Sequence, residues 1–117
     1  MNMELLSSLL DAAVELEKWE TGKEYLRSLL HYDAEAYGTL RRAVALYRGS
    51  GNTSTALEYA GKMVDLYPER TTSISLYAEL LLEAGEREEL RSYIEKNLEE
   101  TDSAEIRSLL YFYRSEI

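Results

Sequence analysis

The residue types that most often carry catalysis or metal binding are scarce in this chain. It has no cysteine, which excludes a thiolate nucleophile and a disulfide, and its single histidine, His31, has neither a second ligand nor a nucleophile in its pattern. Residues 49–52 read Gly-Ser-Gly-Asn, but no Gly-Lys-Ser/Thr follows as in a phosphate-binding loop. The acidic run 99–105 lacks the alternating ligands and the glycine of a calcium loop. The sequence therefore predicts no catalytic residue, no cofactor and no metal.

Length and composition indicate one ordered helical or mixed domain. The chain has 117 residues, 45% of them hydrophobic and 30% charged, with one proline and six glycines, which leaves little room for linkers. We expect a single domain over 1–117 and no disordered segment.

The net charge of -9 is unevenly distributed along the chain. Residues 1–36 carry -5, residues 37–70 carry +2 and residues 71–117 carry -6. Such an acidic chain repels phosphate backbones and anionic lipid, so we expect neither nucleic acid nor membrane as a partner. The sequence shows no basic leader and no apolar run of membrane-spanning length, and we expect a cytoplasmic protein.

Apolar positions recur with a period of thirty-four residues, in sets spaced as one face of a helix. Examples are Leu6, Leu40 and Ile74; Leu10, Val44 and Ala78; Ala13, Tyr47 and Leu81; Tyr25, Tyr59 and Tyr93; and Gly51 and Gly85. The last segment matches at a shift of thirty-two, through Ile106, Leu109, Leu110 and Tyr113. On this alignment Phe112 takes the place of Ala12, Leu46 and Leu80.

This pattern predicts two helices per period and a seventh helix at the end. The expected helices cover residues 3–16, 20–31, 34–48, 53–67, 72–84, 87–99 and 103–117. Gly51 suits the left-handed residue that often follows a helix, and Pro68 prevents simple continuation of the fourth helix. The expected N-terminal caps are Asp33, Asn52 or Thr53, and Asp102.

One stretch carries the most detailed pattern, from Leu40 to Pro68. It contains Leu40, Ala43, Val44, Tyr47, Gly51, Ala56, Ala60 and Pro68. This arrangement resembles the tetratricopeptide repeat family. The resemblance implies an all-α fold, a right-handed α-solenoid of antiparallel helix hairpins. It would comprise repeats over about 3–36, 37–70 and 71–102 and a terminal helix over 103–117. The first period is the weakest, since Gly22 stands where Ala56 does.

The resemblance also implies where a partner binds, because in this family the first helix of each repeat lines a concave groove. The inward positions become Ser7, Asp11 and Val14; Arg41, Ala45 and Arg48; Ser75, Glu79 and Leu82; and Arg107, Tyr111 and Arg114. On this hypothesis the four arginines donate to carboxylates of an extended or helical peptide, and Tyr111 stacks on an apolar side chain. The competing interpretation is that Arg41 and Arg48 pair with Asp11 and Glu79 of neighbouring helices.

The family resemblance leads us to expect a non-enzymatic module that binds a protein or peptide. The family's clamp for carboxy-terminal tails is not expected, because Ser7 and Asp11 replace its lysine and asparagine. Two alternatives stay open. One is a small secretion or assembly chaperone for a dedicated client. The other is a segment of a longer repeat array, or a homo-oligomer, that associates through Leu109, Phe112 and Ile117.

Overall fold

The computed structural model describes residues 2–117, and over that range the chain is all-helical. The helices are α1 (Met3–Glu15), α2 (Trp19–Tyr32), α3 (Tyr37–Gly49), α4 (Thr53–Leu66), α5 (Thr71–Glu83), α6 (Arg87–Glu100) and α7 (Ala104–Ser115). Seven helices were expected from the apolar periodicity, and their number and order are confirmed for the described residues.

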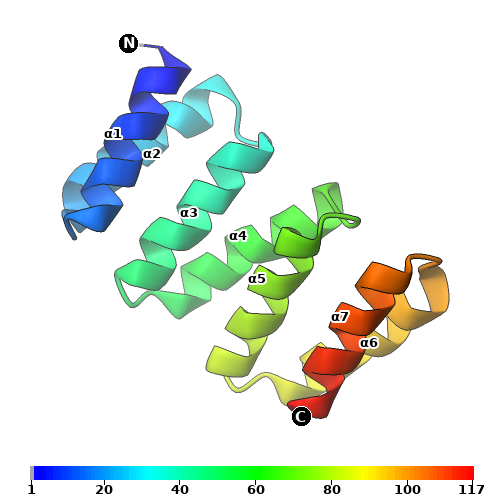
Figure 1. The fold of residues 1–117 in the computed structure, drawn as a ribbon. Coiled ribbons are helices and arrows are strands. Elements are labelled where there is room, and N and C mark those ends of the chain that lie inside the picture. The colour runs from blue at the N-terminus through cyan, green and yellow to red at the C-terminus, as the bar shows by residue number, and fades with distance from the viewer. Residues whose placement is uncertain (1) are drawn as a thin grey trace.

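The helices form an elongated row rather than a closed bundle (Figure 1). Its principal extents are 44 × 26 × 18 Å. Within each hairpin the two helices are in contact, α1 with α2, α3 with α4 and α5 with α6, and each second helix also contacts the first helix that follows. Figure 1 shows α1, α3, α5 and α7 on the near side and the two termini at opposite ends.

The core consists of three apolar clusters, each made by one hairpin and the first helix of the next. The first joins Leu10 and Leu26 to Leu46 of α3, the second contains Leu80 of α5, and the third contains Leu110 of α7. These helices, 12 to 14 residues long, bury only one stripe against their own partner, so the neighbouring hairpin completes the burial.

Three turns between paired helices repeat the same backbone hydrogen bond at thirty-four-residue intervals. The amides of Lys18, Asn52 and Glu86 donate to the carbonyls five residues earlier, at 2.8, 2.8 and 2.9 Å. This is the helix-ending bond of a Schellman motif, which requires a left-handed residue just before the donor. Gly51 and Gly85 supply it with φ of 85° and 75°, as predicted for Gly51.

In the first turn the left-handed residue is Glu17, with φ of 58°, and the sequence pattern gave no sign of it. Its Cβ crowds the following carbonyl, which costs about 1–2 kcal/mol for an L-residue in this conformation. The turn forms nonetheless because its hydrogen bonds and the packing of α1 on α2 impose the same geometry as in the other two hairpins.

Gly22 allows a close approach of α2 to its neighbours. A Cβ at Gly22 would lie 2.8 Å from Leu46 Cδ1 and 3.5 Å from Leu10 Cδ1. The residue that weakens the repeat pattern of the first hairpin is therefore the one that lets α1, α2 and α3 pack together.

Two expected caps are wrong. Asp33 ends α2 instead of starting α3, because its Oδ1 accepts the amide of Glu35 in a local turn, and α3 begins only at Tyr37. At α7 the cap is Ser103, whose Oγ accepts the amide of Ile106, rather than Asp102. Asn52 caps α4 as expected, by accepting the amide of Thr55.

The buried side of α7 is the expected one, because Ile106, Leu110 and Tyr113 of the predicted apolar set are buried. Leu46 and Leu80 are fully buried against the preceding hairpin, whereas Phe112, their expected counterpart, is 55% exposed. Tyr113 occupies this buried side of α7, packed with Leu110 against α5 and α6.

We predict that Glu17→Gly raises the free energy of unfolding by about 1 kcal/mol, because glycine adopts positive φ without the Cβ clash. Urea denaturation followed by circular dichroism measures the change. Glu17→Ala, which removes the carboxylate but keeps the Cβ, is the control and should match the parent chain. Equal stabilities of the glycine and alanine variants would contradict this explanation.

Candidate functional site

The predicted groove residues meet in part at the seam between α3 and α5. The backbones of these two helices do not approach within 8 Å, Cα to Cα, and side chains bridge them. Arg48 donates from Nη2 to Glu79 Oε1 at 3.1 Å and from Nε to Glu83 Oε1 at 3.1 Å. The hydrogen bond to Glu83 raises the pKa of the Arg48 guanidinium, while burial acts in the opposite direction.

Glu79 links this seam to the last helix. Tyr113 of α7 donates from its hydroxyl to Glu79 Oε2 at 3.0 Å, so a single carboxylate accepts from both α3 and α7. Burial raises the pKa of the Tyr113 hydroxyl, and a hydrogen bond with Ser75 opposes that rise. Arg48 therefore pairs with Glu79, as the competing interpretation expected, and Tyr113 adds a second donor to the same carboxylate.

The ion pair between the first two hairpins uses a different arginine from the expected one. Asp11 binds Arg42, with Nε to Oδ1 at 2.9 Å and Nη2 to Oδ2 at 3.2 Å, so its expected pairing with Arg41 is wrong. Adjacent helical positions differ by about 100° in direction, and only Arg42 points toward α1. Arg41 is exposed and makes no ion pair with any of residues 2–117.

The predicted residues of α7 form a separate cluster. Arg107 donates from Nη1 to the carbonyl of Leu98 at 2.7 Å and from Nη2 to the Tyr111 hydroxyl at 3.2 Å. The guanidinium of Arg114 lies 4.8 Å from the centre of the Tyr111 ring. The hydrogen bond to Leu98 therefore holds Arg107 at the end of α6, and the guanidinium groups of Arg107 and Arg114 both lie near the Tyr111 ring.

The other predicted residues divide between surface and core. Ala45 is exposed beside Arg41, whereas Leu82 packs against the core of α5, α6 and α7. Of the three residues expected to mediate self-association, Leu109 and Ile117 pack against that same core and only Phe112 is exposed.

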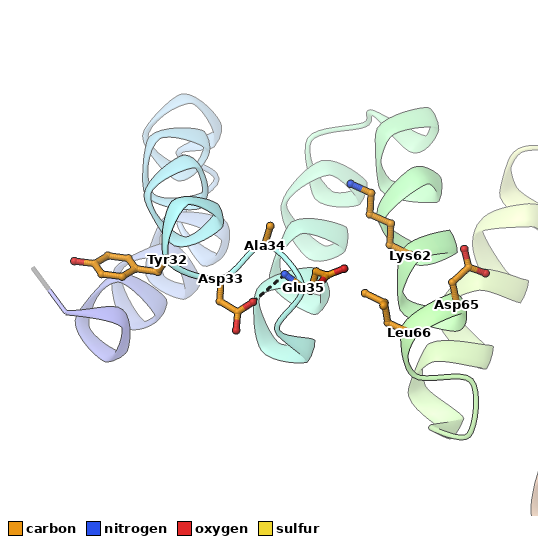
Figure 2. Close-up of a pocket in the computed structure, with 7 residues that line it drawn as sticks. All are labelled: Tyr32, Asp33, Ala34, Glu35, Lys62, Asp65 and Leu66. Atoms are coloured by element: carbon orange, nitrogen blue, oxygen red, sulfur yellow. Dashed lines mark hydrogen bonds between the residues drawn. The ribbon is translucent and has the colours of Figure 1, made fainter.

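A cleft lies on the opposite side, between α2 and α4, and sequence reasoning missed it. It has a volume of about 770 Å³ and is lined by Tyr32, Asp33, Ala34, Glu35, Lys62, Asp65 and Leu66. Figure 2 shows Lys62 and Leu66 projecting from α4 toward the 33–35 connection, while Tyr32 and Asp65 point away. No motif marked these residues, because the cleft results from the late start of α3.

Within 2–117 no group of three histidine, cysteine, aspartate or glutamate side chains could hold a metal ion. Over the same range, no helix is both long and apolar enough to cross a bilayer.

Comparison with known proteins identifies no relative: no family model, no curated protein and no solved structure matches this chain.

We predict that Glu79→Gln lowers the free energy of unfolding by about 1 kcal/mol, because Arg48 and Tyr113 both lose a charged acceptor. Thermal and urea denaturation at low and high salt measure this, and salt should shrink the difference. Glu95→Gln, at an exposed position of α6, is the matched control. If Glu95→Gln lowers the free energy of unfolding as much as Glu79→Gln does, the change in net charge, and not the link between α3 and α7, is responsible.

Alkaline pH should destabilise the fold through its buried tyrosines. Tyr93 packs edge-on against Tyr77 with ring centroids 4.9 Å apart, and burial raises its pKa well above the ordinary 10.0. Above pH 10 the unfolded chain loses this proton first. The stability carried by the neutral hydroxyl is therefore complete below that pH and is lost as pH rises toward the folded-state pKa.

We predict that Tyr93→Phe reduces the loss of unfolding free energy between about pH 8 and about pH 11 by roughly 1 kcal/mol, because one ionisation of the unfolded chain is removed. Urea denaturation at the two pH values gives the difference. Tyr111→Phe, at an exposed ring, should leave the alkaline loss unchanged. An identical pH response of Tyr93→Phe and the parent would refute the linkage.

Proposed function

We propose that this chain is a non-enzymatic interaction module, a tetratricopeptide-like right-handed solenoid of three hairpins and a terminal helix. The proposal is supported by recurrence at several levels. The same turn hydrogen bond recurs every thirty-four residues. Each apolar cluster joins the two helices of one hairpin to the first helix of the following hairpin. Such stacks present one continuous face made by their first helices, where partners bind.

The single observation that carries the binding proposal is the open guanidinium of Arg41. It lies on the same face of α3 as Ala45 and Arg48, at i, i+4 and i+7. Arg48 is already held by Glu79 and Glu83, whereas Arg41 has a full set of donors for an incoming carboxylate. The small side chain of Ala45 leaves the backbone of a bound segment room to approach.

The charge distribution favours an acidic ligand on this face. Residues 37–70 carry +2 between two acidic flanks, so an acidic peptide is attracted to α3 and repelled elsewhere. We therefore propose an acidic peptide segment of another protein as the ligand, with Arg41 as the principal donor and Arg48 as a second donor that shares its carboxylates.

We predict that Arg41→Ala weakens binding of an acidic peptide by about tenfold, because a charge-assisted hydrogen bond is lost. Fluorescence anisotropy against a labelled peptide library rich in aspartate and glutamate identifies a ligand and measures the affinity. Arg27→Ala, at an exposed position of α2, is the charge-matched control and should bind like the parent.

Two results would contradict the proposal. One is that no acidic peptide binds, and the other is that Arg27→Ala and Arg41→Ala weaken binding equally. The latter would indicate general attraction to a positive charge rather than a site on α3.

A further inference from the structure

The first helix carries a second apolar stripe that faces solvent. Leu5, Leu9, Ala12 and Leu16 follow one another at intervals of four, three and four residues, which places them on one side of α1. Leu5 is 47% exposed and Leu16, just past the helix, is 66% exposed. This stripe is distinct from Leu6, Leu10 and Ala13, which are buried in the first core.

The positions that match Leu5 and Ala12 are buried in the later hairpins, whereas Ala84, which matches Leu16, is exposed. Ala12 corresponds to Leu46 and Leu80 at successive shifts of thirty-four residues. Both leucines are fully buried, and each packs into the core of the hairpin that precedes its own helix. The packing of this fold therefore covers the stripe with helices, and within residues 2–117 no preceding hairpin covers it on α1.

The second helix extends the same open surface. A cleft of about 330 Å³ lies between α1 and α2 and is lined by Leu6, Glu24, Tyr25, Ser28 and Tyr32. Tyr25 is one period before Tyr59, which stacks on Tyr47 inside the second hairpin. We define the N-terminal face as Leu5, Leu9, Ala12 and Leu16 of the stripe together with Glu24 and Tyr25 of the cleft.

The opposite end of the row is built differently. There α7 exposes a single large apolar ring, Phe112 at 55%, and beside it carries Arg107, Tyr111 and Arg114, a cation–aromatic cluster that is compatible with water. The N-terminal face instead presents four apolar positions in one stripe.

We propose that the N-terminal face docks an amphipathic helix of a partner protein whose apolar side is flanked by lysine or arginine. Helical shape follows from the packing of Leu46 and Leu80 at equivalent positions. The basic flanks follow from charge, since residues 1–36 carry -5, Glu15 and Glu17 flank Leu16 in sequence, and Glu24 lines the cleft. A second copy would bring another acidic end, of -5 or -6, against this one.

The experiment uses the whole chain and a labelled probe peptide of about 18 leucine and lysine residues, arranged to form an amphipathic helix. The leucine/lysine peptide should bind, and the double variant Leu5→Gln with Leu16→Gln should weaken binding by at least about tenfold, because two buried leucine contacts are lost. Leu66→Gln, at an exposed leucine of α4, is the matched control and should bind like the parent. Circular dichroism checks that all variants stay folded.

Hydrogen exchange places the probe on the molecule and separates this proposal from peptide binding on α3. Protection confined to α1 and α2 supports it. Protection of α3 to α5, equal binding of a scrambled peptide or of a leucine/glutamate helix, or no binding at all would overturn it. Light scattering supplies one further outcome: a concentration-dependent dimer that the double variant abolishes would assign the face to a second copy and overturn the proposal.

Discussion

Each hairpin of this chain has an apolar side that only the first helix of the next hairpin can bury. Leu46 completes the core of the first hairpin, Leu80 that of the second and Leu110 that of the third. Removing one hairpin would therefore expose the boundary of another. The relative placement of successive hairpins is set at these boundaries. The length and curvature of the row, and the positions of its surface residues, follow from that placement.

Polar contacts between first helices are secondary to this packing. A buried leucine contributes about 1.5–3 kcal/mol, whereas an exposed ion pair contributes about 0–1 kcal/mol. The pairs from Arg42 to Asp11 and from Arg48 to Glu79 are only partly shielded from water. They therefore adjust the spacing of helices that apolar packing has already brought together, and Arg48 does so between two helices, α3 and α5, whose backbones do not come within 8 Å, Cα to Cα.

Sequence periodicity predicted the helices and the buried stripes well, because both depend on local spacing. It failed where the answer depends on rotation about a helix axis. Asp11 meets Arg42 rather than Arg41. It also missed Glu17, since a left-handed conformation at a non-glycine residue is imposed by packing and has no residue signature.

The two ends of a stack are where this dependence leaves an exposed surface, and the chain treats them differently. At α7, one large apolar ring, Phe112, is exposed beside the charged and hydroxyl groups of Arg107, Tyr111 and Arg114. At α1, the equivalent boundary retains Leu5 and Leu16, whose exposure is unfavourable and which make no contribution to the first core. Apolar residues at an interior boundary are covered by the neighbouring hairpin, and the helical partner that we propose would cover those at the N-terminal face in the same way.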